Sequence, residues 1–267
     1  DLSWWSVLWK KFIGGVLSIA SGLMLNREGP SIQLGALTAK GVSVLLKSSE
    51  MERRSLIASG AAAGLAAAFN APIAGLLFVV EEVYHQFSRL VWVSALAASI
   101  TANFISLHVF GLTPVLHMPE DLQLLSLVQY WIYILLGIFL GLAGYVYEVV
   151  ILNIQVFYNM LAKIIPLPAP YYSVFAFLFI MPIGYYFPNL LGGGHQLILE
   201  LPHLDQGLLT LAILILIRFV WSMISYGSGL PGGIFLPILT LGSLLGLFVA
   251  RFILDIGFIS QDQMLLF

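Results

Sequence analysis

An arginine and a glutamate stand side by side at Arg27 and Glu28, within a stretch of the chain that is otherwise almost wholly apolar. Gly29 and Pro30 follow them directly. Proline suits the first turn of a helix, because the amides of that turn have no intrahelical acceptor, and glycine lets the backbone bend tightly just before it. The stretch therefore predicts a helix that starts in apolar surroundings with a carboxylate at its start.

The segment 228–242 repeats this pattern far along the chain, because it runs from glycines through prolines into an apolar helix. Both stretches contain Pro-x-x-x-Leu-Gly, at 30–35 and at 237–242. Two hydrophobic segments interrupted by glycine and proline at matching places in two halves of a chain point to a substrate site between the repeats of a membrane transporter. Either stretch taken alone could also be an ordinary kink or loop in a membrane helix.

A helix that begins inside a bilayer presents unpaired N–H groups and the positive end of its dipole to a space with little water, where an anion or another acceptor satisfies them. Two such starts that face each other would form an anion site. The carboxylate of Glu28 would lie beside the same amides and compete with the anion for them. When ionised it would close the site, and when protonated it would swing away, so that anion passage and proton uptake become linked.

Three motifs carry a resemblance to a known family. They are Asn-Arg-Glu-Gly-Pro at 26–30, Gly-Ala-Ala-Ala-Gly-Leu-Ala-Ala-Ala-Phe-Asn-Ala-Pro at 60–72 with two glutamates further on, and Gly-Ser-Gly-Leu-Pro-Gly-Gly-Ile-Phe-Leu-Pro at 227–237. In content and order they resemble the CLC family of chloride channels and chloride/proton exchangers, over nearly the whole chain. The resemblance implies an all-α polytopic membrane protein built as a CLC-type inverted repeat, with tilted helices and re-entrant half-membrane helices.

The resemblance also assigns site residues. It implies that Glu28 is the gating glutamate, which exchanges its proton as the anion passes. Backbone amides are implied as the anion donors, with Ile234 and Phe235 for the central anion and Gly29 and Leu236 for an outer position. Supporting positions of the same motifs are Arg27, Pro30, Glu81, Gly232, Gly233 and Pro237. Asn26 departs from the family, which usually has glycine there, but asparagine tolerates positive φ and the turn is expected to survive.

Glu82 falls on the family's inner proton glutamate, where exchangers carry an acid and many channels carry an apolar residue. This match favours proton-coupled chloride/proton antiport over its alternatives, which are a passive voltage- or pH-gated chloride channel and a fluoride/proton antiporter. A simpler interpretation of the same residues also stands. His85 lies three residues after Glu82, and Arg89 lies a turn further, so they could form a polar helix end with local salt bridges.

Hydrophobic residues make up 60% of the chain, charged residues make up 9%, and the mean hydropathy is +0.99. These values exclude a soluble domain and predict a multi-pass protein of the lipid bilayer, which we place in the cell inner (plasma) membrane. The net charge of −2 argues against a nucleic-acid partner. The chain has no cysteine, and no second histidine lies at metal-binding spacing from His195, so we expect no disulfide, metal or cofactor. The expected partners are chloride, protons and, from the resemblance, a second copy in a homodimer.

We expect residues 1–267 to be part of a single CLC transmembrane domain. About 1–165 would hold part of the first repeat and the start of the second, and about 166–267 part of the second repeat, with prolines at 166, 168 and 170 between them. The N- and C-terminal parts of the domain are expected to be missing. In the family those parts supply a serine and a tyrosine whose hydroxyls bind the central anion.

Hydrophobic runs between polar or glycine-proline breaks predict helices at 4–25, 31–46, 56–70, 73–80, 91–110, 125–162, 171–187, 208–224 and 234–251. The segments 73–80 and 91–110 are candidates for the dimer contact. Glycine pairs spaced by four residues, at 60/64, 137/141 and 242/246, predict close helix packing. Arg218 lies within an apolar run and demands a carboxylate or backbone carbonyl as partner. Glu148, the single acid of its run, is expected in a structural or interfacial place.

We expect no enzyme activity. An intramembrane serine hydrolase that uses Ser228 and His195 is the alternative from a different class, because Gly-Ser-Gly at 227–229 superficially resembles a nucleophile motif. No base lies at a defined helical spacing from this serine. Such an enzyme would also leave the two anion-type helix starts unexplained.

Overall fold

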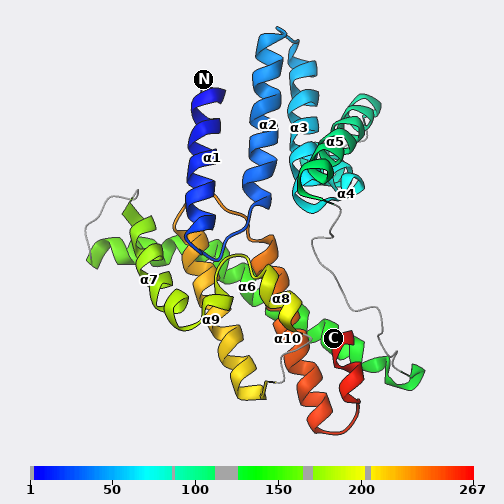
Figure 1. Cartoon of the computed structure of the whole chain (residues 1–267), viewed down its shortest axis with the longest axis vertical. Coiled ribbons are helices and arrows are strands. Elements are labelled where there is room, and N and C mark those ends of the chain that lie inside the picture. Colours follow the sequence, from blue (N-terminus) through cyan, green and yellow to red (C-terminus); the bar gives the residue numbers. More distant parts are fainter. Residues whose placement is uncertain (1–2, 86–87, 112–125, 165–170, 202–205) are drawn as a thin grey trace. The chain divides into compact units, whose positions relative to one another are not determined.

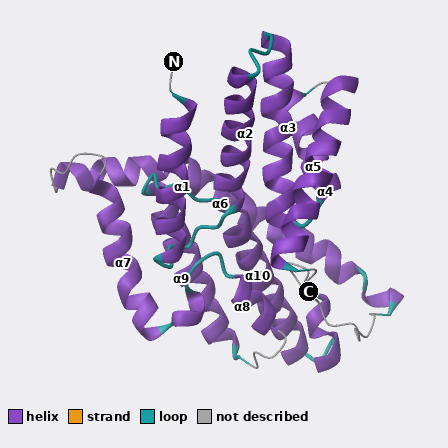
Figure 2. Ribbon diagram, turned by 45° about the horizontal axis from the view of Figure 1, so that its top comes forward, coloured by secondary structure: helices purple, strands orange, loops and turns teal. Residues whose placement is uncertain are grey.

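The computed structural model describes residues 3–85, 88–111, 126–164, 171–201 and 206–267, and within them the elements are helices (Figure 1). The helices are α1 (Trp4–Ala20), α2 (Glu28–Leu45), α3 (Glu50–Phe69), α4 (Pro72–Phe78), α5 (Arg89–Phe110), α6 (Trp131–Ile164), α7 (Tyr172–Tyr186), α8 (His195–Glu200), α9 (Leu208–Gly227) and α10 (Phe235–Asp255). A π-helical turn follows α4 at Val79–Tyr84, and short 3₁₀ turns lie at Leu127–Gln129, Pro188–Leu190 and Gln261–Leu266. The helical content, drawn in purple in Figure 2, confirms the all-α prediction.

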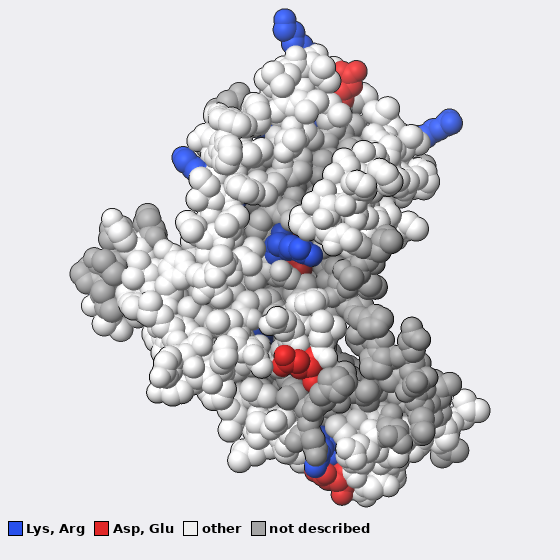
Figure 3. All heavy atoms as spheres, in the orientation of Figure 1, with Lys and Arg blue, Asp and Glu red and all other residues white. Residues whose placement is uncertain are grey.

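Four of the described helices, α5, α6, α9 and α10, are long and apolar enough to cross a membrane, and α7 is a shorter apolar helix. Most atoms on the face drawn in Figure 3 belong to uncharged residues. Large apolar side chains lie on the outside of these helices, since Leu152 of α6 and Phe104 of α5 are 72% and 69% exposed. Such exposure is costly in water and favourable in lipid. The chain is a multi-pass membrane protein, as its composition predicts.

The predicted helix ranges differ from the observed ones mainly at their ends. Helix α1 stops at Ala20 instead of residue 25, because Gly22 has a φ of +84° and turns the chain out of the helix. Helix α2 begins at Glu28 instead of Ser31, so the glutamate is the first residue of the helix. The predicted exposed turn at 111–124 and the proline connector lie almost wholly outside the described residues.

The chain divides into two compact units. Unit 1 consists of Asp1–Ile19, Arg27–Val115 and Pro231–Gly233, and unit 2 consists of Ala20–Asn26, Leu116–Leu230 and Ile234–Phe267. The segment that leads into α2 therefore belongs to unit 2, and the residues that lead into α10 belong to unit 1. The predicted repeat boundary near residue 165 is a different kind of division and stays a prediction.

In unit 1 the helices α2 and α3 pack through small residues. A Cβ atom on Gly64 would collide with the Ser31 carbonyl, and a Cβ atom on Gly60 would collide with the Gly35 carbonyl. On its other side α3 buries alanines against α4 and α5 in a core that includes Ala62, Leu76, Val79, Val91 and Ala95. The predicted packing role of the 60/64 glycine pair is confirmed.

In unit 2 the long helix α6 packs against α9. The hydroxyl of Tyr158 donates to the Ile224 carbonyl at 2.5 Å, and Gly227 lies against the same tyrosine ring. The structure does not support the predicted packing role of Gly137 and Gly141, because a Cβ atom on either would meet no atom of the described residues within 4 Å. Spacing places two glycines on one face of a helix but does not say whether another helix covers that face.

In α10, too, glycine spacing alone does not determine which glycine is covered. Gly246 of α10 lies under the Phe267 carbonyl, whereas a Cβ atom on Gly242 would meet nothing within 4 Å. Gly242 instead lines an apolar cavity of about 590 Å³ between α6, α9 and α10. Glu148 of α6 is exposed. Its structural or interfacial place stays a prediction.

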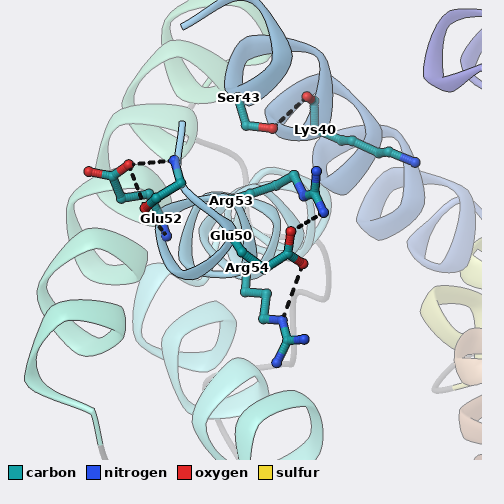
Figure 4. A network of polar contacts seen from close by, with 7 residues as sticks. Lys40, Ser43, Glu50, Glu52, Arg53 and Arg54 are labelled. Atoms are coloured by element: carbon teal, nitrogen blue, oxygen red, sulfur yellow. Dashed lines mark hydrogen bonds and ion pairs between the residues drawn. The ribbon is translucent and has the colours of Figure 1, made fainter. Parts of the chain in front are cut away.

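The polar turn between α2 and α3 explains why α3 starts at Glu50 (Figure 4). Ser49 caps the helix, because its hydroxyl oxygen accepts a hydrogen bond from the Glu52 amide. The Glu52 carboxylate in turn accepts hydrogen bonds from the Ser49 amide and hydroxyl, both at 2.8 Å. The Ser49 hydroxyl and amide lower the pKa of Glu52, and Arg53, which donates to Glu50, lowers the pKa of that carboxyl. Because each carboxyl has a lowered pKa in the folded protein, its ionised form stabilises the helix start at pH values above its unfolded pKa. This stabilisation is lost as the pH falls through the folded pKa.

We expect Gly64→Ala to destabilise the protein by about 1–3 kcal/mol, because the new methyl group must displace the backbone of α2. Thermal unfolding of the purified protein in detergent measures the change. Gly141→Ala is the matched control, since its methyl group meets open space and alanine favours a helix over glycine. Equal unfolding temperatures for the two variants would contradict the packing described for α2 and α3.

Candidate anion and proton site

Helix α2 starts with an acid at the positive end of its dipole. Glu28 is the first residue of the helix and is only 4% exposed, and Pro30 in the same turn is also buried. The preceding residue, Arg27, has a helical backbone and contributes no capping side chain. Its guanidinium instead reaches α3, where Nη2 donates to the Ala68 carbonyl at 3.2 Å. The carboxylate is thus buried where a helix stabilises negative charge.

Helix α10 starts in the same way. Its N-cap residue, Ile234, also has a helical backbone and contributes no capping side chain, and Pro237 lies in the first turn. Gly229, six residues before α10, has a φ of +74°, and Gly22, six residues before α2, has a φ of +84°. The two loops therefore repeat one backbone form before two helices.

The sequence carries a signal for this repeat that the motif analysis missed. When the two Pro-x-x-x-Leu-Gly motifs are aligned, Ser-Gly-Leu at 21–23 falls on Ser-Gly-Leu at 228–230. The same alignment pairs Ser18 with Ser225 and Met24 with Pro231, residues that look unrelated in the sequence alone. Both pairs matter in the structure.

Each loop is held by a serine at the matching position of the other copy. In unit 1, the Ser18 hydroxyl donates to the Pro231 carbonyl at 2.6 Å. In unit 2, the Met24 amide donates to the Ser225 hydroxyl at 3.1 Å. Ser18 and Ser225 are both buried, at 0% and 1% exposure, so each bond is protected from water. The repeat thus forms two reciprocal hydrogen bonds, Ser18 to Pro231 and Met24 to Ser225, which we call the two clasps.

Small residues of α1 lie against two prolines of unit 1, Pro30 and Pro231. A Cβ atom on Gly15 would lie 3.5 Å from the Pro30 ring, and a Cβ atom on Gly14 would lie 3.2 Å from the Pro231 ring. These glycines leave room for Pro30 of α2 and for Pro231, which precedes α10. A side chain at Gly14 would crowd the Pro231 ring, whereas a methyl group at Gly15 would make an ordinary van der Waals contact with the Pro30 ring.

The start of α2 touches the residues that lead into α10. A Cβ atom on Gly29 would lie 3.3 Å from the Gly233 Cα and 3.4 Å from the Gly232 carbonyl oxygen, so only glycine permits this approach without displacement. Unit 1 therefore gathers Glu28, Gly29 and Pro30 with Gly232 and Gly233. The remaining predicted donors, Ile234, Phe235 and Leu236, follow Gly233 directly in the chain, and of these Leu236 is buried and Phe235 is 54% exposed.

Glu81 and Glu82 lie apart from these contacts, on the π-helical turn after α4, and both are exposed. The prediction of one continuous helix with local salt bridges is wrong. The turn ends at Tyr84 because His85 adopts a φ of +51°, and Arg89 begins a new helix, α5. Within the described part of the chain neither glutamate forms an ion pair. π-Helical turns are frequent at functional sites, and no sequence pattern signalled this one.

Arg218 is fully buried in α9 and has backbone carbonyls as partners, as predicted. Its Nη1 donates to Leu190 and Gly192, at 2.8 and 2.9 Å, and its Nη2 donates to Gly193 at 2.8 Å. The serine hydrolase alternative gains no support, because the Ser228 hydroxyl donates to the Ser225 carbonyl of its own helix at 2.6 Å. A serine hydroxyl that donates its hydrogen to a backbone carbonyl is not donating it to a base that could activate the serine.

We expect Ser18→Ala to cost about 1–2 kcal/mol of stability, because the Pro231 carbonyl loses its buried donor. Ser225→Ala should have a similar effect through the Met24 amide. Ser243→Ala is the control, since that hydroxyl bonds only the Leu239 carbonyl of its own helix. Thermal unfolding in detergent compares the three. A loss for the control as large as for Ser18 would refute the clasp.

A family model described as voltage gated chloride channel matches residues 1–265. The H(+)/Cl(-) exchange transporter ClcA of Vibrio parahaemolyticus is 38% identical over 254 residues, which cover 91% of this chain and 52% of that protein. ClcA of Salmonella arizonae is 35% identical over 254 residues, with the same coverage. The chain thus spans about half the length of the curated relatives that it matches.

Solved structures agree with the sequence relatives. A slow cyanobacterial Cl-/H+ antiporter superposes with a TM-score of 0.82 at 32% identity, over 96% of this chain and 60% of that one. A CLC-type fluoride/proton antiporter superposes with a TM-score of 0.73 over 96% of this chain and 62% of that one, but its 22% identity supports the fold alone. The resemblance seen in the three motifs is confirmed, and the chain belongs to the voltage gated chloride channel family, the CLC family.

Proposed function

We propose that the chain forms part of a chloride/proton antiporter in which Glu28 alternates with chloride at the start of α2, beside the residues that lead into α10. One observation carries this proposal. The Glu28 carboxylate is buried at the first residue of α2, and the next residue, Gly29, touches the loop that leads into α10. A buried acid at a helix start competes with any anion that uses the same end of the helix.

The anion would be held by backbone amides. Neither N-cap residue, Arg27 or Ile234, offers a capping side chain. The amides of a first turn have no intrahelical acceptor, so a helix without a capping side chain favours an anionic ligand there. The donors we propose are Gly29 and Leu236 for an outer position and Ile234 and Phe235 for a central one.

Proton coupling would follow from the chemistry of Glu28. In the ionised state its carboxylate occupies the end of α2 and excludes chloride. A proton removes the negative charge that the helix start favours, so the side chain leaves and chloride takes its place. Each cycle then couples anion movement to protonation, and chloride flux should rise as pH falls.

Glu82 would pass protons between the inner solution and Glu28. Its exposure on the π-helical turn suits this role, because a proton donor at the start of a path must exchange with water. Glu81, also exposed, would assist. The antiporter names of the relatives support this proposal over a passive channel.

The active protein in this proposal is longer than the chain. The relatives extend over about twice its length, so residues 1–267 would be part of one transmembrane domain in a homodimer of the inner membrane. A serine and a tyrosine from the remaining parts would complete the central anion site. Transport experiments therefore use the full-length protein, reconstituted in liposomes.

We expect Glu28→Gln to retain chloride flux and to lose chloride-driven proton movement, because glutamine mimics the protonated side chain and carries no proton. Chloride release and external pH are recorded together in liposomes with a chloride gradient. The variant's chloride flux should also become independent of pH. Glu148→Gln, which removes an exposed acid of α6, is the control and should behave as the native protein. Proton movement that survives in Glu28→Gln would refute the gate.

We expect Glu82→Val to keep chloride flux while coupled proton movement falls to background. Valine is apolar and cannot exchange a proton with the inner solution. The same liposome assay measures the ratio of protons to chloride ions moved. An unchanged ratio would reduce Glu82 to a polar residue at a helix end. Absence of proton movement in the native protein itself would favour a passive channel.

A further inference from the structure

Arg218 lies at the centre of a network that the proposed transport cycle does not use. Its two terminal nitrogens donate to the carbonyls of Leu190, Gly192 and Gly193, and the side chain is 0% exposed. No carboxylate pairs with it within the residues that the structure describes. A buried guanidinium without a counter-ion is expensive, so the positions of its carbonyl partners must be well defined.

The same glycine loop supports the segment that leads to Glu28. The Gly192 amide donates to the Gly22 carbonyl at 2.9 Å. A Cβ atom on Gly193 would lie 3.0 Å from the Asn26 side-chain Cγ, so the two residues are in close contact. Asn26 stands two residues before Glu28 in the chain. The loop that Arg218 holds therefore packs against residues 22–26, the segment that precedes α2.

The loop also reaches the first turns of α10. The Thr240 hydroxyl lies 3.0 Å from the Gly193 carbonyl and 2.8 Å from the Leu236 carbonyl, and it is fully buried. A Cβ atom on Gly194 would collide with Thr240 and would lie 2.5 Å from Arg218 Nη2. The Gly193 carbonyl thus receives donors from two helices, α9 and α10.

We propose that Arg218 is a positioning residue for transport, which fixes the segment before Glu28 and the first turns of α10 through the Gly192 and Gly193 carbonyls. The inference rests on the proposed function of Glu28. A gate that alternates between two positions requires a backbone that does not move with it, and a displacement of about 1 Å in such a site can lower its rate by about 100-fold.

The rigid, planar arrangement of the guanidinium donors matters in this role as much as the charge of the group. Arginine offers several donors in one rigid plane, whereas lysine offers a compact point charge on a flexible chain. Lysine at 218 could not hold the carbonyls of residues 190, 192 and 193 in the same arrangement. Arg218→Lys should therefore resemble Arg218→Met, although only the second removes the charge.

The first experiment measures backbone position without transport. The chain has no cysteine, so Ser21→Cys, at an exposed residue before Asn26, gives one attachment site for a nitroxide within residues 1–267. In the full-length protein, any cysteine elsewhere is first replaced. Spin-label mobility should rise in the Arg218→Lys and Arg218→Met backgrounds. Thr240→Val should give a smaller rise, because it removes one of the two donors to Gly193. Thr101→Val, whose hydroxyl bonds only its own helix, should give none.

The second experiment measures coupling in liposomes. Both Arg218 variants should lower proton movement per chloride ion by between about 10- and 100-fold and change the pH dependence of chloride flux, while Thr101→Val keeps both. Size-exclusion chromatography and thermal unfolding show whether each variant folds. Unchanged label mobility in folded Arg218 variants would overturn the inference, and native behaviour of Arg218→Lys would assign the role to charge and also overturn it.

The two experiments separate this inference from the proposed function. If the native protein moves no protons, the antiporter proposal fails, and the label still decides whether Arg218 holds the segment before α2. If protons move and depend on Glu28 but not on Arg218, the proposed function stands and the positioning role falls. For variants that do not fold, Thr240→Val and Asn26→Gly test the same contacts with smaller changes.

Discussion

The close contact between the start of α2 and the loop before α10 is the constraint on which the rest of the site depends. Gly29 can lie this close to Gly232 and Gly233 without displacement because it carries no side chain. Glu28, the residue before Gly29, is buried where the dipole of α2 favours negative charge. Two backbone segments so close, in an apolar protein, need polar groups that fix them without filling the space between them.

The two clasps and the arginine network supply those groups. Ser18 and Ser225 each bind one loop, while Gly14 and Gly15 leave room for Pro231 and Pro30. Arg218 then fixes the glycine loop in unit 2. In each case a polar side chain bonds a backbone carbonyl or amide, which gives directional bonds at close range.

The repeat is symmetric in its backbone and asymmetric in its side chains. When the prolines are aligned, Glu28 corresponds to Phe235 and Asn26 to Gly233. One helix start therefore carries an acid and the other an apolar residue. Under the proposed function this difference allows a single carboxylate to compete with the anion, while the matching start supplies amides without a competing charge. Under that proposal, the matching loops would serve as a gate in one copy and as an anion-binding site in the other.

The sequence by itself determined the fold class, the family and the two helix starts. Apolar runs, glycine-proline breaks and three long motifs are local signals, and they also predicted that Arg218 needs a carboxylate or a backbone carbonyl as partner. Most helix ranges were close. The errors at α1 and α2 arose near a glycine or a proline, and α3 starts six residues earlier than predicted because Ser49 and Glu52 cap it.

Only the tertiary structure decided which signals were used. It covered Gly60 and Gly64 and left Gly137 and Gly141 without a neighbour within 4 Å, although their spacing is the same. It turned the segment around Glu82 into a π-helical turn and separated it from Arg89. It also paired Ser18 with Pro231 and Arg218 with Gly193. Such contacts join residues far apart in the chain, so the relative placement of whole helices, which no local pattern encodes, determines them.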